Sequence, residues 1–404
     1  MDKLVLKNEL LQRLSLLRNN SLTLQEFFQY NLDVPITNKI LIVQFRAIGD
    51  AYLLSGFIRE IKLNNLDKDI VIICDYNNYP VFEHCPYTSE VIPLKYRENL
   101  YDSIEDFINI CYSKFWNYKF ELAFCVQIGR NNLFNMLCAN LVGAQTKVGF
   151  GANVQQMYLG NIAPTEFDFL LDNNVLHPSN MYNDNDRKMF LLKSLNYKIS
   201  SDKLESWLSD DDINNARYLI NHKYINIIIG LGGRQNKKKY SPNLLLEVLK
   251  EIQDDKTQFI LVGSAEDIES ANYLMDNIKC INLVSLLSIR QTCAIISLSD
   301  IYIGNDTATL HMASIYHLSI IGLYMEAKDK MNDNPGLLSS IKRFAPKNIK
   351  ILQPERALYP CNNVHCHGGC DSHTAHCINQ INPSKIAEAY KEVKKCINLK
   401  KKKY

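Results

Sequence analysis

The sequence predicts an α/β protein with two doubly wound parallel-sheet domains that face each other across a cleft. Three observations support this fold class. The chain has 404 residues, which suits two domains of about 100–200 residues each. Short β-branched runs alternate with longer amphipathic segments, as expected when strands are buried on both faces of a sheet. The alternation occurs twice, once in each half of the chain.

The first half of the chain supplies three strand candidates. Residues 39–45 read KILIVQF, a run typical of a buried parallel strand. Residues 69–74 and 121–127 have a similar composition. Residues 51–63 lie between the first two runs and carry apolar side chains at helical spacing. This order predicts parallel strands that are joined by helices.

The second half repeats the pattern. We expect strands at residues 224–231, 258–263, 300–304 and 318–323, and helices at residues 244–252, 266–275 and 288–297. Open α/β sheets bind ligands beyond the carboxyl ends of their strands, so each domain should present its functional loops at that edge.

Four segments divide the chain. Residues 1–38 precede the first strand, and their leucines are spaced as in an amphipathic helix, which we expect to pack on the body. The first domain covers residues 39–215 and the second covers residues 222–382, with a polar join between them. Residues 383–404 form a final helix and a basic tail.

The composition excludes one class of function and indicates a compartment. Lys and Arg number 45 and Asp and Glu 43, a net charge of +2, whereas a dedicated nucleic-acid binder carries a clear basic excess. We find neither a signal-peptide core nor a run of about 18 apolar residues, and therefore expect a cytoplasmic protein. The lysines at residues 400–403 are either a solvated tail or a peripheral contact with the inner face of the plasma membrane.

The segment after the first strand holds a candidate catalytic residue. It reads Arg46-Ala47-Ile48-Gly49-Asp50 and leads into a helix. Asp50 is placed either to cap that helix or to present its carboxylate to the cleft as a general base. Position alone leaves both interpretations open.

The strand at residues 300–304 ends in a candidate anion site. Asn305-Asp306-Thr307 opens the next helix, and His311 lies one turn beyond Thr307. A helix N-terminus presents unbonded N–H groups and the positive end of the helix dipole, so a diphosphate would fit there. Capping alone explains Asp306 or Thr307, but it does not readily explain the whole group.

Two more loops follow strands of the second half. In the loop at residues 232–240, glycines allow the backbone to approach a ligand, and three lysines, Lys238 among them, are able to hold phosphate. The loop at residues 263–266 ends in Glu266, which either contacts a ribose or base hydroxyl or is an ordinary acidic residue in the first turn of a helix.

Together these motifs resemble glycosyltransferase family 9, the heptosyltransferase family of lipopolysaccharide assembly. The resemblance covers roughly residues 39–390. The residues that carry it are Gly49-Asp50, Lys238-Lys239-Tyr240, Gly263 with Glu266, and Asn305-Asp306-Thr307-Ala308 with His311. Tyr240 stands where the family usually has Trp, and Ala308 stands where it usually has Gly.

The resemblance implies a GT-B fold with two Rossmann-like domains. It implies an enzyme that transfers a heptose, or a similar sugar, with inversion from an ADP-linked donor to a hydroxyl of the lipopolysaccharide core or a related surface glycan. The first domain would bind the acceptor and the second the donor. No metal or other cofactor is required for this catalysis.

The same resemblance implies roles for individual residues. Asp50 matches the general base of the family. Lys238 would face the donor phosphates, and Glu266 would contact the nucleoside. The other donor-binding residues that it implies are Asn305, Asp306, Thr307, Ala308 and His311.

Cysteines and histidines crowd into residues 360–377. Four of the twelve cysteines of the chain lie here, at Cys361, Cys366, Cys370 and Cys377. Thiolates and imidazoles at this density suit a structural zinc or iron site, although the C-x2-C pairs of common zinc ribbons are missing. Other cysteines lie in apolar runs and are expected to be small buried residues, namely Cys74, Cys125, Cys138, Cys280 and Cys293.

Other functions remain open at this stage. The acceptor is a protein in one of them, an autotransporter-type O-heptosyltransferase with cysteine-bound iron or zinc. A sugar-nucleotide epimerase of the same fold agrees less well with the motifs, and a non-catalytic scaffold organised by the metal is a further alternative. Asp184-Asn185-Asp186 has the carboxylate spacing of a metal-dependent sugar-nucleotide site, but we expect it in a surface loop at residues 173–186.

Overall fold

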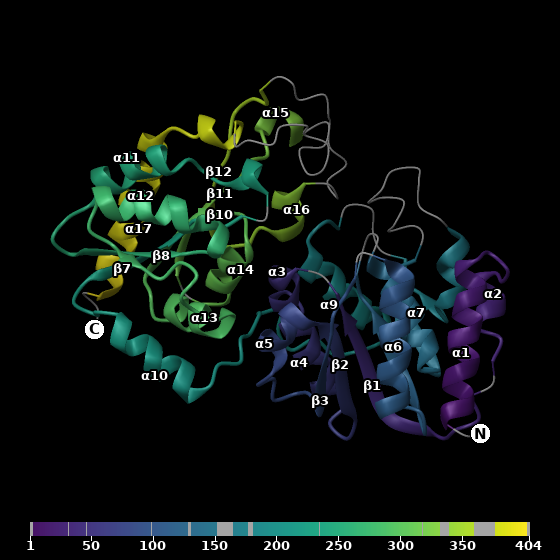
Figure 1. The fold of residues 1–404 in the computed structure, drawn as a ribbon. Helices are drawn as coiled ribbons and strands as arrows, with labels where there is room; N and C mark the ends of the chain where they lie inside the picture. The colour runs from purple at the N-terminus through teal and green to yellow at the C-terminus, as the bar shows by residue number, and fades with distance from the viewer. Residues whose placement is uncertain are drawn as a thin grey trace. The chain divides into compact units, whose positions relative to one another are not determined.

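The computed structural model describes residues 3–30, 32–45, 47–97, 99–127, 131–151, 165–176, 181–233, 235–316, 318–331, 339–358 and 376–401 (Figure 1). The chain divides into two compact units. The first unit comprises Met1–Met181 and Asn185–Asp202, and the second comprises Tyr182–Asp184 and Lys203–Tyr404. Each unit contains one six-stranded sheet, and all the strand pairs given for it are parallel.

The sheet of the first unit has the strand order β3-β2-β1-β4-β5-β6. Its strands are β1 (Ile36–Gln44), β2 (Asp69–Asp75), β3 (Glu90–Leu94), β4 (Lys119–Cys125), β5 (Thr146–Gly149) and β6 (Asn173–Asn174). Its helices are α1 (Lys3–Arg18), α2 (Leu24–Phe27), α3 (Ile48–Tyr52), α4 (Ser55–Asn64), η1 (Tyr76–Asn78), α5 (Tyr79–Phe82), α6 (Leu100–Lys114), α7 (Asn131–Leu141), η2 (Thr165–Leu170) and α9 (Asp184–Ser194).

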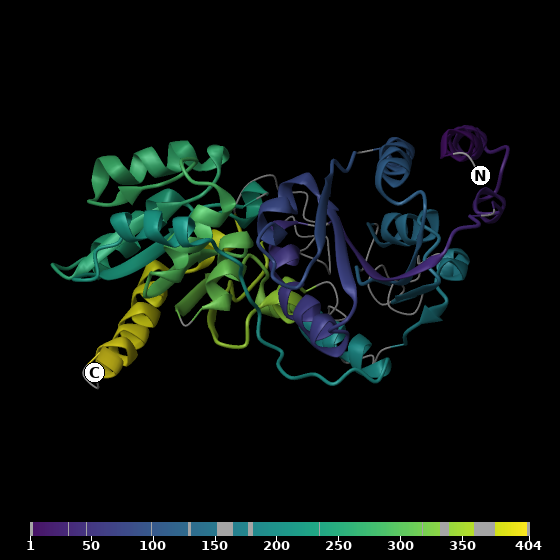
Figure 2. The same ribbon diagram turned by 90° about the horizontal axis from the view of Figure 1, so that it is seen from below.

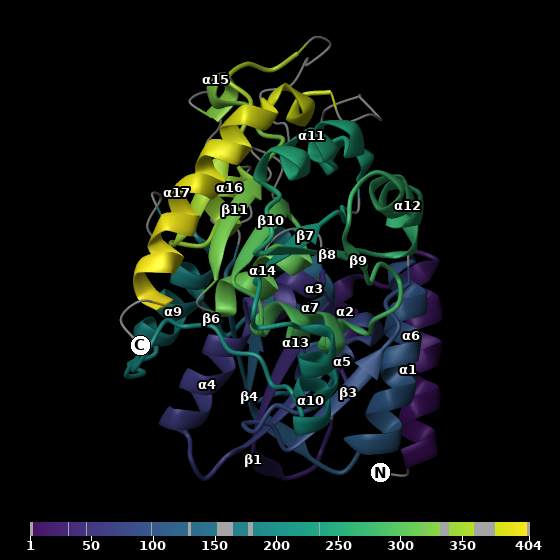
Figure 3. The same ribbon diagram turned by 90° about the vertical axis from the view of Figure 1, so that its left-hand side faces the viewer.

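The amphipathic N-terminal segment forms α1 and packs on the body of the first unit. Leu6, Leu10 and Leu14 are buried, and they belong to the same hydrophobic core as the side chains of α6. The two helices lie side by side in Figure 3. The four-residue spacing of these leucines places them on one face of the helix, and that face is the one that packs.

The sheet of the second unit has the order β12-β11-β10-β7-β8-β9. Its strands are β7 (Ile225–Gly230), β8 (Thr257–Val262), β9 (Ile281–Asn282), β10 (Ile301–Asn305), β11 (Ser319–Leu323) and β12 (Ile349–Leu352). Its helices are α10 (Asp210–Leu219), η3 (Asn236–Lys238), α11 (Pro242–Ile252), η4 (Ala265–Asp267), α12 (Ile268–Asn277), α13 (Ile289–Ser297), α14 (Ala308–Ile315), α15 (Lys328–Met331), α16 (Ser340–Phe344), η5 (Ile378–Gln380) and α17 (Pro383–Lys401).

The core of the second unit lies between its sheet and its helices. All six residues of β7 are buried, which explains why this strand is a nearly unbroken run of isoleucines. The final helix, α17, is yellow in Figure 2 and packs against α11 and β11. Helix α17 joins the core through buried residues, which include Ile386, Ala387, Ala389 and Tyr390.

The division between the units differs from the sequence-based domain limits. Residues 203–215, which the sequence analysis places in the first domain, lie with the second unit. In this region α10 packs against α13 of the second unit, and Arg290 Nε of α13 lies 3.1 Å from Asp212 Oδ2 of α10. Asp212 also closes a capping box with Ser209 at the start of α10.

Two local predictions need correction. The stretch at residues 173–186 is not one surface loop, since β6 begins it and α9 starts at Asp184, a residue whose side chain is buried. Acidic residues favour the first turn of a helix, near the positive end of the dipole, so Asp184-Asn185-Asp186 opens α9. The helix expected at residues 51–63 is split, because α3 ends at Tyr52 and α4 begins at Ser55.

Two general expectations concern the membrane and the cysteines. Among the helices that the structure describes, none is both long and apolar enough to cross a membrane. The cysteines expected in the core are buried at Cys74, Cys125, Cys138 and Cys293, and Cys280 is half-buried. Burial raises the pKa of the Cys125 thiol to about 12, so this group is a neutral hydrophobic side chain at physiological pH.

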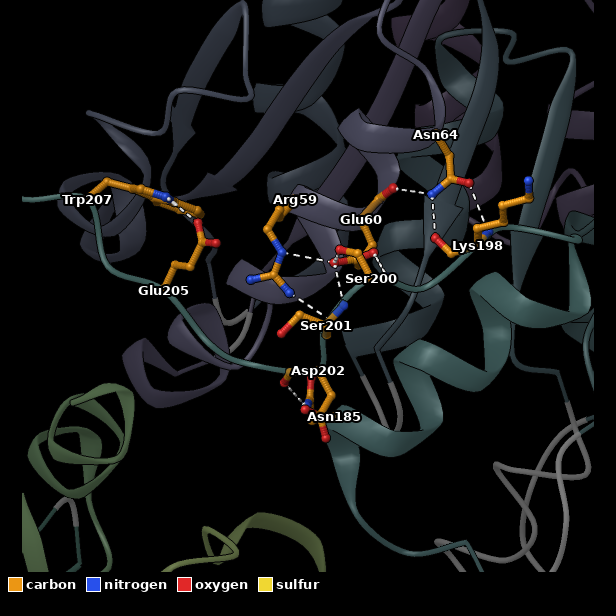
Figure 4. A network of polar contacts seen from close by, with 10 residues as sticks. All are labelled: Arg59, Glu60, Asn64, Asn185, Lys198, Ser200, Ser201, Asp202, Glu205 and Trp207. Atoms are coloured by element: carbon orange, nitrogen blue, oxygen red, sulfur yellow. Dashed lines mark hydrogen bonds and ion pairs between the residues drawn. The ribbon is translucent and has the colours of Figure 1, made fainter. Parts of the chain in front are cut away.

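A polar network fastens the end of the first unit to α4 (Figure 4). The carboxylate of Glu60 accepts hydrogen bonds from the Ser200 N–H at 2.7 Å, the Ser200 hydroxyl at 2.8 Å and Arg59 Nε at 2.9 Å. Arg59 also donates to the carbonyl of Ser201 at 2.7 Å, and Asn64 donates to the carbonyl of Lys198 at 2.9 Å. The segment at residues 198–202, where the first unit ends, is therefore attached to the helix that follows α3.

Candidate active site

Both sheets have a topological switch point, and several of the candidate residues, among them Asp306 and Lys238, follow the strands that form it. In the second unit the chain order along the sheet reverses between β7 and β10, which pair in register from Ile301 with Ile227 to Gly304 with Gly230. Loops that leave two such strands diverge to opposite sides and create room for a ligand at the carboxyl edge. In the first unit the corresponding switch lies between β1 and β4.

Asn305 joins the two loops at the switch point of the second unit. Its Nδ2 donates to the carbonyl of Leu231 at 2.9 Å and to that of Gly232 at 3.1 Å, and its Oδ1 accepts from the N–H of Tyr240 at 3.1 Å. The side chain of Asn305 is buried. Its amide thereby holds both ends of the loop between Leu231 and Tyr240 against the end of β10.

Two glycines, Gly230 and Gly304, face each other across this switch point, and neither position has room for a side chain. A Cβ atom on Gly304 would lie 2.6 Å from the carbonyl oxygen of Gly230, which real side chains do not tolerate. A Cβ atom on Gly230 would collide with the hydroxyl of Tyr302. The two glycines therefore leave room for the buried Tyr302 ring beneath the candidate site.

Lys238 and Asp306 form an ion pair between the loops that follow β7 and β10. Lys238 Nζ lies 2.9 Å from Asp306 Oδ2, and the two side chains are only 16% and 8% exposed. An ammonium group has three donors, so Lys238 is able to keep this contact and also donate to a phosphate oxygen. The structure thus brings together two of the residues that the sequence analysis assigns to the donor.

A second ion pair, which sequence reasoning missed, supports the same loop. Lys239 Nζ lies 2.7 Å from Asp267 Oδ1, and Asp267 is buried. The other oxygen of Asp267 accepts from the N–H of Ser264 at 2.8 Å and closes a capping box. The predicted Glu266 is 72% exposed, with Lys239 at 3.9 Å. A Ser-x-x-Asp pattern after β8 is the signal that points to Asp267.

The N-terminus of α14 has no side-chain cap. Thr307 occupies the cap position with extended backbone angles, φ −146° and ψ 179°, but its hydroxyl does not bond to the N–H groups of the first turn. That hydroxyl contacts the Thr309 hydroxyl at 3.0 Å instead. The capping interpretation of Thr307 is therefore wrong, and α14 begins at Ala308 without a side-chain cap from Thr307.

His311 lies one turn along α14, where it is largely buried. Its N–H donates to the carbonyl of Thr307 at 3.3 Å, the hydrogen bond of the first helical turn. Its ring meets the ring of Phe344 edge to face at a centroid distance of 6.3 Å. His311 therefore packs α14 against α16 and lies beside the group of residues formed by Asp306, Thr307 and Ala308.

A buried acidic residue beyond β11 adds to the electrostatics of the region. Burial raises the pKa of Glu326, and the negative charge of Asp306 raises it further. Hydrogen bonds from the Ser339 hydroxyl and the Ile341 N–H lower the pKa, but the net shift is upward. The hydroxyl of Ser339 donates to Glu326 Oε2 at 2.8 Å.

In the first unit, Asp50 lies in the first turn of α3, directly beyond β1. Ala47 and not Asp50 holds the cap position of this helix, so the capping interpretation of Asp50 is wrong. Asp50 is half-buried. Gln127 donates to Gln44 at 2.9 Å between the ends of β4 and β1, and this buried amide pair lies at the switch point of the first sheet. Arg46 lies outside the described residues.

The predicted metal site falls mostly outside the described residues. This applies to Cys361, Cys366 and Cys370. Cys377 is described and buried, and its Sγ accepts a hydrogen bond from the N–H of Leu358 at 3.4 Å. Within the described part of the chain, no group of three or more His, Cys, Asp or Glu side chains is arranged to hold a metal ion. The zinc or iron site stays a prediction.

A family model matches the part of the chain that contains the donor-site candidates. The match covers residues 160–337 and has the description glycosyltransferase family 9 (heptosyltransferase). This stretch of the chain is therefore similar to the family 9 glycosyltransferases. The resemblance recognised from the motifs is thereby confirmed, and the matched stretch includes Lys238, Glu266 and the residues from Asn305 to His311. Asp50 lies outside it.

Curated relatives match over a shorter stretch. Lipooligosaccharide heptosyltransferase 2 of Campylobacter jejuni is 23% identical over 117 residues, which is 29% of this chain and 33% of the relative. The same enzyme from a second strain of that species is 24% identical over 119 residues, or 30% of this chain and 33% of the relative. The match thus spans about a third of the length of these relatives.

Solved structures share the fold over most of the chain. A family 9 glycosyltransferase of Veillonella parvula has a TM-score of 0.71 and 13% identity and covers 88% of this chain and 96% of its own. ADP-heptose lipopolysaccharide heptosyltransferase II of E. coli has a TM-score of 0.62, with 15% identity over 88% and 98%. E. coli heptosyltransferase WaaC, solved with ADP, has a TM-score of 0.64, with 10% identity over 88% and 99%. The predicted α/β GT-B fold with two Rossmann-like domains is confirmed.

Proposed function

We propose that the protein is an inverting glycosyltransferase that moves a heptose, or a similar sugar, from an ADP-linked donor to a hydroxyl of the lipopolysaccharide core or a related surface glycan. The observation that carries the proposal is the group of residues at the switch point of the second sheet. There the Lys238–Asp306 ion pair lies next to the uncapped N-terminus of α14, inside the stretch that matches the family model.

The second unit would hold the donor and stabilise its leaving group. When the bond between the sugar and the diphosphate breaks, negative charge grows on the diphosphate. The Lys238 ammonium, the N–H groups at the start of α14 and the Thr307 hydroxyl are fixed in place before the reaction, so they stabilise that charge without reorganising. Asp306 neutralises part of the charge of Lys238, which limits non-productive binding of other anions.

The first unit would supply the base. Inversion takes one displacement at the anomeric carbon, and the attacking hydroxyl must lose its proton on the way. Asp50 is the carboxylate at the switch point of the first sheet. An ordinary Asp, with a pKa of about 3.9, cannot deprotonate a free alcohol in advance. It accepts the proton late, as positive charge builds on the attacking oxygen.

Removing the Lys238 charge tests the donor site. Lys238→Met should weaken ADP binding by about 10- to 100-fold, the loss expected for one charge-assisted hydrogen bond. Lys250→Met, on the exposed side of α11, is the matched control and should bind ADP like the wild type. Isothermal titration calorimetry measures both. Equal affinity of the two variants would rule out Lys238 as a phosphate ligand.

Removing the Asp50 carboxylate tests the reaction. Asp50→Ala should abolish sugar transfer from ADP-heptose to a lipopolysaccharide core acceptor while leaving ADP-heptose binding close to that of the wild type. Asp69→Ala is the control, because Asp69 lies at the amino end of β2 and pairs with Lys39 at the surface. Near-normal turnover by Asp50→Ala would refute the assigned base.

An acceptor of this class is anchored in a membrane, and we propose that the protein reaches it as a cytoplasmic protein at the inner face of the plasma membrane. Lys391 and Lys394 of α17 pair with Glu251 and Asp254, and we propose that the lysines at residues 400–403 make the membrane contact. Flotation with anionic liposomes, with and without residues 400–404, tests this. Equal partitioning of the two forms would exclude the contact.

A further inference from the structure

Three hydroxyl groups form a line that runs from the core of the second unit to the start of α14. The hydroxyl of Tyr302 lies 2.8 Å from that of Thr309, which lies 3.0 Å from that of Thr307. Tyr302 is on β10 and fully buried, whereas Thr307 and Thr309 are half-buried. The line therefore begins in the buried core at β10 and ends at the N-terminus of α14, in the candidate donor site.

Ordinary local structure does not account for this line. A threonine in the cap position usually bonds to the N–H groups of its own helix, but the hydroxyl of Thr307 bonds sideways to Thr309. A tyrosine at position 302 also fits only because positions 230 and 304 are glycines. The Thr307–Thr309 contact and the glycines that accommodate Tyr302 thus both involve the same three hydroxyls.

The chemistry of the groups sets the direction of the hydrogen bonds. A phenol is a stronger acid than an aliphatic alcohol, so it is the better donor of the pair Tyr302 and Thr309. Burial raises the pKa of Tyr302 to about 12 against the lowering effect of hydrogen bonds with the Thr309 and Thr307 hydroxyls, and the phenol therefore keeps its proton at physiological pH. The carbonyl of Asn305, a competing acceptor, is 3.4 Å away, which is farther than Thr309. With Tyr302 as the donor to Thr309, the proton of the Thr309 hydroxyl is left to donate to Thr307.

We propose that Tyr302 is a positioning residue which acts through Thr309 and directs the hydroxyl proton of Thr307 toward the diphosphate of the sugar donor. This inference rests on the proposed function. A phosphate oxygen only accepts hydrogen bonds, so it requires the outward direction of the Thr307 proton. Hydrogen bonds that point the same way along a chain strengthen one another, and the last donor in the line therefore binds the anion best.

The variants for the test remove single hydroxyls and keep the shape of each side chain. Tyr302→Phe and Thr309→Val interrupt the line, Thr307→Val removes its last donor, and Thr309→Ser restores the hydroxyl at the middle position. Tyr390→Phe is the matched control. Tyr390 is also a buried tyrosine of the second unit, and its hydroxyl meets the Thr257 hydroxyl at 3.4 Å, in a pair that involves none of the donor-site residues.

The measurements are the dissociation constant of ADP by calorimetry and the midpoint of thermal unfolding. We expect Tyr302→Phe and Thr309→Val each to weaken ADP binding by about fivefold, a typical effect for one hydrogen bond. Thr309→Ser should stay close to the wild type, and Tyr390→Phe should bind ADP unchanged. In the Thr307→Val background, Tyr302→Phe should have no further effect, because the last donor of the line is already missing.

Two results would overturn the inference while leaving the proposed function in place. One is ADP binding by the wild type that Tyr302→Phe and Thr309→Val do not alter. The other is an equal loss of affinity from Tyr302→Phe with and without the Thr307 hydroxyl, which would make Tyr302 a packing residue. Failure of the wild type to bind ADP at all would overturn the proposed function and this inference together.

Discussion

The buried carboxylate of Glu60 offers a sharp test of how the first unit is held together. Its side chain is 0% exposed and accepts hydrogen bonds from the Ser200 N–H, the Ser200 hydroxyl, Arg59 Nε and the Ser201 N–H, at 2.7, 2.8, 2.9 and 3.3 Å. Glu60→Gln keeps the shape of the side chain but replaces one acceptor oxygen with an NH2 group. That NH2 group cannot accept the hydrogen bonds that the surrounding N–H and O–H donors make to the carboxylate.

The expected magnitude follows from burial and charge. Burial raises the pKa of Glu60, but the hydrogen bonds from Ser200 and from Arg59 outweigh it and lower the pKa overall, so the group is charged at neutral pH. Removing one partner of a buried, hydrogen-bonded ion pair costs about 3–5 kcal/mol. Since 1 kcal/mol shifts the unfolding midpoint of a unit of this size by about 2–4 °C, Glu60→Gln should lower it by about 6–20 °C.

Thermal unfolding and amide hydrogen exchange measure this effect. The N–H groups of Ser200 and Ser201 donate to Glu60, so their exchange should accelerate in Glu60→Gln. Glu251→Gln is the matched control, because Glu251 pairs with Lys391 at 2.7 Å on the surface, where both side chains are well exposed. That pair is worth about 0–1 kcal/mol. The reasoning is refuted if the two variants unfold within about 2 °C of each other and the protection of the Ser200 amide is unchanged.

Three further predictions concern other parts of the chain. Gly304→Ala should destabilise the second unit by about 1–3 kcal/mol in denaturant unfolding, because the added methyl meets the Gly230 carbonyl; wild-type stability would contradict the close approach. A hydrogen bond from Lys394, followed by one from a neighbouring hydroxyl, lowers the pKa of Asp254 to about 2, so its stabilisation is complete above its ordinary pKa and is lost as the pH falls toward 2. Asp254→Asn should therefore flatten the fall in thermal stability between about pH 4 and pH 2, and an unchanged slope would exclude this contribution. Purified protein should contain zinc or iron held by Cys377 and its neighbouring cysteines, and less than about 0.2 equivalents by elemental analysis would exclude a stable site.

Strands were predictable from the sequence where they are buried on both faces. The runs at residues 69–74 and 224–231 are close to β2 and β7, because a parallel strand that is covered on both sides must be apolar throughout. The short strands β3 and β5 escaped prediction, since Glu90–Leu94 and Thr146–Gly149 are partly exposed and mix polar with apolar residues. Edge and short strands are stabilised by pairing with a neighbour more than by their own composition.

The candidate site was predictable as a set of positions but not as a set of contacts. Asp306 and Lys238 were identified from motifs at two different strand ends, and their ion pair arises because β10 and β7 are neighbours in the sheet. The Ser-x-x-Asp pattern marks Asp267 as the partner of a capping box, but it does not show that this carboxylate is buried or that it pairs with Lys239. Glu266, next to it in the chain, is exposed, and only the direction of the η4 turn separates the two.

The sequence by itself determined the fold class, the family resemblance and the strand ends that carry polar residues, because these depend on local composition and on the order of short motifs. Only the tertiary structure decided which partners those residues have. It placed Asn305 against the Leu231–Tyr240 loop and joined Tyr302 to Thr307 through Thr309. The physical reason is that a hydrogen bond between side chains needs atoms about 3 Å apart, and the pairing of strands far apart in the chain sets that distance.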